Sequence, residues 1–270
     1  IQLDDKNSRK NITIITFYGS IASSLAWLIV GKLLPDYGLE TTCFFLSICL
    51  FAMGIYFFVY SFVKDKGRGA SEIKKFVNIR FSELIPKEKK VVLFLMLLGF
   101  VQYLVFSTTA LSLVDYFSLK FEVYYFAIVL ASIYGPFQLV GRLIEMGLAN
   151  KYDARVTGLF ASLVMPISLI LLFSSNFSIC ILSMALFGMS NGLLTVTNGY
   201  LPNLFFEPNV IGRIKGYIGA PTALGMAFSP FLSGIFSENL NILLILMIIL
   251  SLIPIASIFL LRNEKTRIIN

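Results

Sequence analysis

The sequence predicts an all-α membrane protein with about eight transmembrane helices. Of its 270 residues, 57% are hydrophobic and only 14% are charged, and the mean hydropathy is +0.83. Soluble domains are about 45–50% apolar and about 25% charged. The apolar residues fall into eight runs, each long enough to cross about 30 Å of hydrocarbon as a helix. Together, these observations indicate an integral membrane protein.

The eight runs are expected to be helices rather than strands. They are too long for strands, and they lack the alternation of apolar and polar residues that marks a membrane β-barrel. An even number of spans places both ends of the chain on the same side of the membrane. The expected spans are residues 12–34, 41–63, 91–113, 123–147, 157–173, 178–201, 214–236 and 242–261.

Basic residues are distributed unevenly among the polar segments that connect these spans. Suppose that residues 64–90, every second connection thereafter and both ends lie on one side. That side then holds all of the 22 Lys and Arg residues except Lys32 and Lys120. Cytoplasmic segments carry such an excess of Lys and Arg, so we expect these segments in the cytoplasm. The net charge of +7 therefore reflects topology, and we expect no nucleic acid as a partner.

Residues 64–90 form the only long polar stretch, with two spans before it and six after it. We interpret it as a solvated, partly helical cytoplasmic linker. The alternative is a site for anionic lipid or for a partner, because clusters of Lys and Arg attract acidic headgroups.

The two neighbouring spans 178–201 and 214–236 are rich in glycine and proline. In water, each glycine would cost a helix about 1 kcal/mol relative to alanine. In a bilayer, small residues let helices approach closely, and proline is tolerated where neighbours satisfy the freed carbonyl groups. Bent, glycine-rich helices suit a protein that rocks around a cavity. The residues concerned are Gly188, Gly192, Gly199, Gly212, Gly216, Gly219, Pro221, Gly225, Pro230 and Gly234.

The sequence offers little for metal or cofactor chemistry. Histidine, the commonest general base and metal ligand, is absent. Cys43, Cys49 and Cys180 lie in apolar runs without regular spacing, which is typical of buried small hydrophobic residues. We therefore expect no metal site, no disulfide framework and no cofactor.

The chain shows two features of a known family: six spans that follow a long basic loop, and several local motifs. Residues 134–142, YGPFQLVGR, resemble the eighth helix of many bacterial members of the major facilitator superfamily. Residues 188–202 and 212–230 resemble helices ten and eleven of the same transporters, including Pro221 and the AFSP pattern at 227–230. The chain is therefore similar to bacterial-type transporters of this superfamily over nearly its whole length.

The resemblance implies a truncated chain that holds helices five to twelve. Residues 1–63 would be the last two helices of the N-terminal bundle, 64–90 the cytoplasmic linker and 91–270 the C-terminal six-helix bundle. The implied function is secondary active transport of a small solute by alternating access, without enzymatic activity. The implied location is the bacterial inner membrane, where we expect a monomer whose partners are the solute and membrane lipid.

Two motifs of the family are degenerate here. In the loop after the eighth helix the basic Lys151 and Arg155 are retained, but Asn150 stands where an aspartate is usual. Since a neutral amide makes no charge-assisted bond, the latch between cytoplasmic helix ends should be weaker. The Gly-Pro motif of proton-coupled drug antiporters is replaced by Ala-Trp-Leu at 26–28, which disfavours drug–proton exchange.

Gln138, Arg142 and Glu145 are spaced so that they share one helix face. One interpretation is a structural pair, Arg142 with Glu145, that pins helix ends. The other is a gate or an anion-contacting arginine, because charges within a membrane are costly and usually functional. With the latch residues, the gate candidates are Gln138, Arg142, Glu145, Asn150, Lys151 and Arg155.

Polar residues on two spans are candidates for the wall of a substrate cavity. Asn191, Thr195 and Asn198 share one face of the tenth-helix equivalent, and the resemblance implies that this helix and the seventh line the cavity. The alternative is helix–helix hydrogen bonding, worth about 0.6 kcal/mol each on average. The matching candidates on the seventh-helix equivalent are Gln102, Tyr103, Ser107 and Thr108.

Carboxylates are expected near the ends of spans and not at their centres. If a proton is the coupling ion, its carrier is expected in helices outside this sequence, because membrane proton relays use intramembrane acids. A membrane-embedded lipid or glycan transferase is a weaker alternative, since such enzymes cluster His, Asp or Glu near one face. A transporter-derived receptor or a non-transporting scaffold is the remaining alternative.

Overall fold

The computed structural model describes residues 8–65, 80–148 and 151–264, and these residues form helices and no strand. Seven segments of the described chain are long and apolar enough to cross a membrane. The prediction of an all-α, multi-pass membrane protein is therefore confirmed. The elements are α1 (Ser8–Asp65), a 3-10 turn (Phe81–Glu83), α2 (Pro86–Phe121), α3 (Tyr124–Leu148), α4 (Ala154–Leu171), α5 (Phe177–Phe205), α6 (Ile211–Ile235), α7 (Leu240–Leu250) and α8 (Leu252–Arg262).

The chain divides into two compact units. One comprises residues 1–21 and 77–270, and the other comprises residues 22–76. These units reflect which residues contact one another, whereas the expected domains are the two halves of a transporter. The division at residues 63 and 90 therefore stays a prediction, and much of the expected linker lies outside the described residues.

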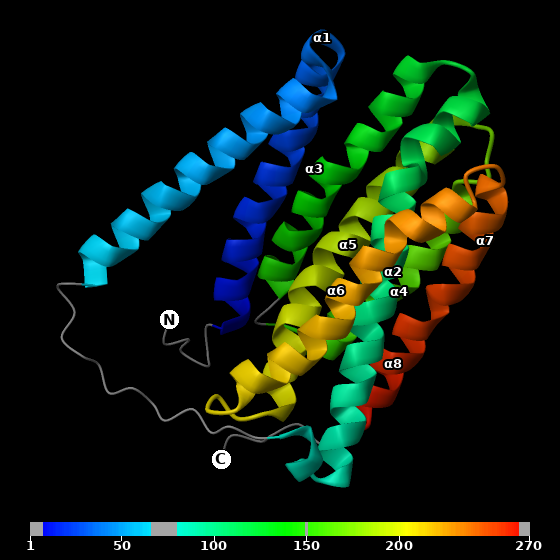
Figure 1. Ribbon diagram of the computed structural model, residues 1–270. Helices are drawn as coiled ribbons and strands as arrows, with labels where there is room; N and C mark the ends of the chain where they lie inside the picture. The colour runs from blue at the N-terminus through cyan, green and yellow to red at the C-terminus, as the bar shows by residue number, and fades with distance from the viewer. Residues whose placement is uncertain (1–7, 66–79, 149–150, 265–270) are drawn as a thin grey trace. The chain divides into compact units, whose positions relative to one another are not determined.

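The unit of residues 22–76 contains most of α1, in which two helices are joined at Gly38 (Figure 1). Gly38 has φ 75° and ψ 174°, a conformation that L-residues with a side chain rarely adopt. The Thr42 hydroxyl donates to the Gly38 carbonyl oxygen at 2.8 Å. The second half coincides with the expected span 41–63. The first expected span, 12–34, is helical throughout, although many of its side chains lie outside the described ones.

The other unit contains six spans, α2 to α8, whose ends differ in places from expectation. α2 begins at Pro86 and continues through the charged residues 87–90, where proline suits the first helical turn. α4 and α5 begin at side-chain caps: Asp153 accepts from the Arg155 backbone N–H at 2.8 Å, and Asn176 accepts from that of Ser178 at 2.9 Å. The last span is interrupted at Ser251, between α7 and α8.

The six spans pack in a regular pattern (Figure 1). α2 packs most extensively against α6, and α3 packs most extensively against α5. α4 packs against α5 and α8, while α8 also packs against α2. If α7 and α8 count as one span, α2 corresponds to α5, α3 to α6, and α4 to α7–α8. Under this exchange, the α2–α6 pair becomes the α5–α3 pair, and the α4–α5 pair becomes the pair of α7–α8 with α2. The buried core includes the aromatic pair Phe106 and Phe187, whose ring centroids lie 4.9 Å apart.

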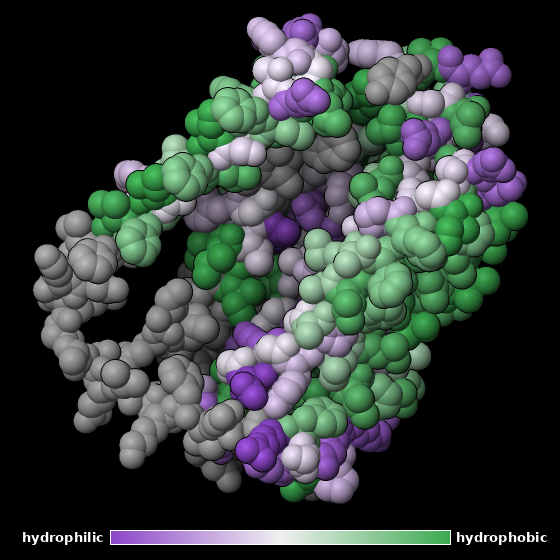
Figure 2. All heavy atoms as spheres, viewed as in Figure 1, coloured by the Kyte–Doolittle hydropathy of each residue, from purple (hydrophilic) through white to green (hydrophobic). Residues whose placement is uncertain are grey.

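The surface of the described residues is that of a membrane protein. On the side of α6, α7 and α8, Figure 2 shows a hydrophobic band between hydrophilic clusters near the two ends of the helices. Exposed side chains in this region include Phe231, Ile245 and Phe259. In water, such a contiguous apolar surface would be unfavourable, whereas a bilayer solvates it.

Candidate functional site

A cavity of about 310 Å³ lies in the unit of residues 1–21 and 77–270. Its walls come from α2, α5 and α6, with Ile12 and Thr16 at the start of α1. Small-molecule sites usually measure about 300–1,000 Å³. Three of the predicted cavity residues line it: Tyr103, Thr195 and Asn198. The polar lining also includes Lys215 and Thr222 of α6, which sequence reasoning did not single out.

Gln102 lies behind this wall, fully buried, and bonds to Asn198. The Asn198 amide nitrogen donates to the Gln102 side-chain oxygen. Both residues keep a further polar atom that is buried without a hydrogen-bond partner, Gln102 Nε2 and Asn198 Oδ1. Because an amide offers both donors and acceptors, one bond between two amides leaves capacity on each. One donor, Gln102 Nε2, and one acceptor, Asn198 Oδ1, therefore remain unused next to the cavity wall.

Asn191 bridges α5 and α3. Its amide nitrogen donates to the Tyr134 hydroxyl of α3, and its backbone carbonyl accepts from the Thr195 hydroxyl at 2.7 Å. The Asn191 side chain is 7% exposed. These contacts are those of a residue that joins two helices, and the prediction that Asn191 lines the cavity stays a prediction. The two remaining candidates, Ser107 and Thr108, are half-buried and buried on α2, and the Thr108 hydroxyl has no partner among the described residues.

The close approach of α3 and α5 positions Arg142. A Cβ atom at Gly188 would overlap the Tyr134 carbonyl oxygen, and one at Gly192 would overlap that of Gln138, so both positions require glycine. Arg142 is buried, and its guanidinium donates to the backbone carbonyl of Thr16, which lines the cavity. Arg142 thus lies directly beside the cavity wall. The third gate candidate on this helix, Gln138, is half-buried.

Glu145 lies one turn further along α3 and is fully buried. Its carboxylate accepts from the Thr157 hydroxyl of α4 at 3.4 Å. Arg142 and Glu145 thus contact different elements, α1 and α4. The two interpretations of this pair, a structural pin and a gate, both stay open.

Of the predicted latch residues, Lys151 and Arg155 lie at the end of the bundle where α4 begins. Arg155 forms an ion pair with Asp153 at 2.7 Å and donates to the Arg262 carbonyl of α8 at 3.0 Å. At the same end, Lys90 forms an ion pair with Glu264 at 2.8 Å. Arg155 therefore ties α4 to the end of α8. Lys151 is exposed, and Asn150 lies outside the described residues.

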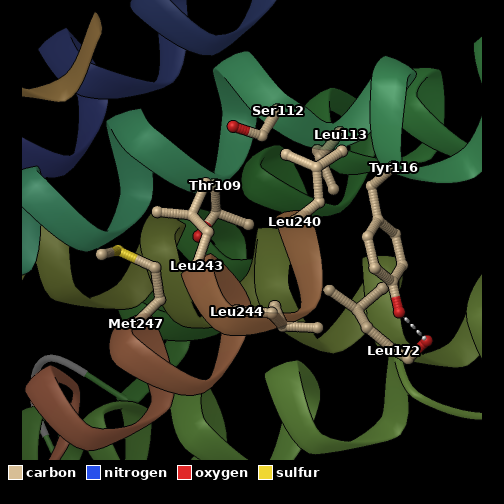
Figure 3. Close-up of a pocket in the computed structure, with 9 residues that line it drawn as sticks. All are labelled: Thr109, Ser112, Leu113, Tyr116, Leu172, Leu240, Leu243, Leu244 and Met247. Carbon is tan, nitrogen blue, oxygen red and sulfur yellow. Dashed lines mark hydrogen bonds between the residues drawn. The ribbon is translucent and has the colours of Figure 1, made fainter. Parts of the chain in front are cut away.

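A second, smaller pocket of about 20 Å³ lies between α2 and α7 (Figure 3). Its lining is mostly apolar, and the Tyr116 hydroxyl at its edge donates to the Leu172 carbonyl at 3.0 Å. This volume holds about one water molecule. The pocket is thus a gap in packing and not a site for a solute.

The structure adds Lys215 to the sequence-based candidates. In the sequence it counts only as one of the basic residues on the expected cytoplasmic side. Its position on the cavity wall follows from the packing of α6 against α2, which hydropathy and charge counts do not reveal. Among the described residues, no group of three or more His, Cys, Asp or Glu lies close enough together to hold a metal ion.

Comparison with models of known protein families and with curated protein sequences found no match for this chain.

Proposed function

We propose that this protein is a secondary transporter of the major facilitator type that moves a small solute by alternating access. The observation that carries the proposal is the cavity between α2, α5 and α6, whose lining combines apolar residues with several polar ones. Tyr103, Thr195 and Asn198, selected from the sequence on two different spans, line the same cavity. Transporters of this kind bind their solute between helix bundles near the middle of the membrane.

The packing pattern is a second line of support. When the first three spans are exchanged with the last three, the pairs α2–α6 and α3–α5 become each other. The pair α4–α5 and the contact of α7–α8 with α2 also become each other. Transporter halves of this superfamily are built from two three-helix repeats of inverted topology. A transporter-derived receptor or scaffold would keep the same repeat, so the packing pattern supports the fold and the labelling experiment below tests transport.

The proposed orientation places both termini in the cytoplasm of a bacterial inner membrane. Its basis is the uneven distribution of Lys and Arg. Lys90, Arg155 and Arg262, all assigned to the cytoplasmic side from the sequence, lie near one another at one end of the bundle. We propose a monomer with a small solute and membrane lipid as its partners, and without enzymatic activity.

Two-sided labelling of the cavity tests this proposal. The complete protein, with Cys43, Cys49 and Cys180 replaced by serine, receives Thr195→Cys in the cavity wall. A membrane-impermeant thiol reagent is then applied to intact cells and to inside-out vesicles. Alternating access predicts labelling from both sides, because the same wall opens to each side in turn. Lys151→Cys is the matched control and should be labelled only in inside-out vesicles.

Labelling of Thr195→Cys from one side only would contradict alternating access and favour a receptor or scaffold. Labelling of Lys151→Cys only in intact cells would reverse the proposed orientation without affecting the transport proposal. Uptake of a panel of radiolabelled solutes into proteoliposomes of the complete protein then identifies the solute.

A further inference from the structure

We propose that the cavity binds the negatively charged group of a small soluble anion, with Lys215 as its charged contact. This inference rests on the proposed function, because it names the class of solute that the transporter would carry. Its basis is the charge and the hydrogen-bonding capacity of the cavity wall.

Lys215 is the one charged residue among the described residues that line the cavity. It is half-buried on α6, and no described side chain forms an ion pair or a hydrogen bond with its ammonium group. A carboxylate or a phosphate would supply the missing counter-charge through a charge-assisted hydrogen bond.

The charges around the cavity also favour an anion. The Arg142 guanidinium lies beside the wall, at the carbonyl of Thr16. The buried acid of the same helix, Glu145, contacts Thr157 of α4, which does not line the cavity. These charges favour an anion, since Lys215 lines the cavity, Arg142 lies beside its wall and no described carboxylate lines it.

The wall also offers groups that can orient an anion. In the Asn198–Gln102 pair, the Gln102 amide nitrogen is an unused donor, and a donor is what an anion requires. Tyr103 adds a hydroxyl group to the same wall, whereas the Thr195 hydroxyl already donates to the Asn191 carbonyl. A cation beside neutral donors such as the Tyr103 hydroxyl suits a carboxylate or a phosphate better than an apolar or a cationic solute.

Lysine near a helix end can instead extend its ammonium group to water and serve only topology. A measurement of the cavity potential separates the two roles. The complete protein carries Gly219→Cys in a background without native cysteines. Gly219 lines the cavity one helical turn from Lys215, and a side chain there meets no atom within 4 Å. The protein is reconstituted in phosphatidylcholine nanodiscs.

Two methanethiosulfonate reagents of similar size, a negative ethylsulfonate and a positive ethyltrimethylammonium, are applied to this thiol. The measured quantity is the ratio of the negative to the positive labelling rate. Lys215→Gln should lower this ratio about tenfold, because loss of a nearby unit charge acts on the two reagents in opposite senses. Lys215→Arg should preserve it. Arg213→Gln is the matched control, since Arg213 is exposed on the same helix outside the cavity, and it should change the ratio less than about twofold, because solvent screens its charge.

A ratio that does not change in Lys215→Gln, or that changes equally in Arg213→Gln, overturns the proposal. Protection from the neutral reagent N-ethylmaleimide supplies the second readout. Citrate or inorganic phosphate should slow labelling of Gly219→Cys several-fold more than potassium chloride of equal ionic strength, and Lys215→Gln should remove this protection.

The same protection assay identifies the source of the anion. If phosphatidylglycerol in the nanodisc protects the thiol and neither soluble anion does, the solute assignment is overturned in favour of a lipid headgroup. If nothing protects, the site does not bind anions and the proposal fails. Charge-selective labelling without two-sided access would support the anion site and refute transport. Two-sided access with no charge selectivity would support transport and refute the anion site.

Discussion

The helices α5 and α6 have similar compositions and opposite environments. In the most apolar stretch of each helix, 67% of the residues of α5 are buried, against 11% for α6. In α5, Gly188 and Gly192 lie directly against the backbone of α3. In α6, Gly216 and Gly219 would meet nothing if they carried a Cβ atom, and only Gly225 lies against another backbone, at Phe100 of α2.

The comparison shows that glycine content alone does not identify a packing face. In α5 the glycines permit α3 to approach until the two backbones touch, which is the role that small residues have in membrane bundles. In α6 most glycines leave open space, and one of them, Gly219, forms part of the cavity. Stability should therefore depend on the glycines of α5 much more than on those of α6.

The largest expected effect is that of Gly188→Ala together with Gly192→Ala in α5. Each new Cβ would overlap a carbonyl oxygen of α3, so the helices must separate. Overpacking of this kind costs about 1–3 kcal/mol per site. The matched pair in α6, Gly216→Ala with Gly219→Ala, should leave the free energy of unfolding unchanged or raise it slightly. Denaturant titration of the purified proteins in detergent measures both. Equal loss of stability in the two double variants would show that the contrast between these helices is wrong.

A smaller effect is expected at the one glycine of α6 that touches α2. Gly225→Ala should lower the free energy of unfolding by about 1–3 kcal/mol, because its Cβ would meet the Phe100 carbonyl oxygen. Gly234→Ala on the same helix serves as the control, since nothing lies within 4 Å of that position. Thermal unfolding followed by circular dichroism compares the two. If Gly225→Ala melts at the same temperature as Gly234→Ala, α6 does not depend on close contact with α2.

Hydropathy and length were enough to predict the seven spans found among the described residues, because burial of apolar residues in lipid is a local requirement of each segment. The details that were missed depend on neighbouring structure. The extension of α2 over residues 87–90 places charges in a helix beyond the apolar run. The break at Ser251 lies three residues before Pro254. A proline ring clashes with the carbonyl group of the residue four positions earlier, here Leu250, and so interrupts the helix.

Helical spacing likewise placed Asn191, Thr195 and Asn198 on one face, and the structure shows what each contacts. Thr195 and Asn198 line the cavity, whereas the Asn191 amide bonds to Tyr134. Periodicity gives the face of a helix but not the helix that covers it. Lys215 was missed for a related reason, since its role depends on the cavity that α2, α5 and α6 form together.

The smallest expected effect concerns the hydrogen bonds that cross each helix pair. α3 and α5 are joined by the bond between Tyr134 and Asn191, while α2 and α6 are joined by Ser112 and Ser233, whose hydroxyl oxygens lie 2.7 Å apart. Cross-helix bonds in membranes contribute about 0.6 kcal/mol on average. A serine hydroxyl that loses its partner can bond to a carbonyl of its own helix. The Tyr134 hydroxyl, at the far end of an aromatic ring, cannot reach a carbonyl of its own helix in this way.

The coupling energy should therefore be larger for Tyr134 with Asn191 than for Ser112 with Ser233. Double-mutant cycles measure it, with Tyr134→Phe and Asn191→Leu in one cycle and alanine at both serines in the other. We expect roughly 1 kcal/mol for the first pair and less than about 0.5 kcal/mol for the second. A larger coupling between the serines would mean that α6 is held to α2 by specific bonds as firmly as α5 is held to α3. The open glycines of α6 would then have no bearing on how tightly this helix is bound.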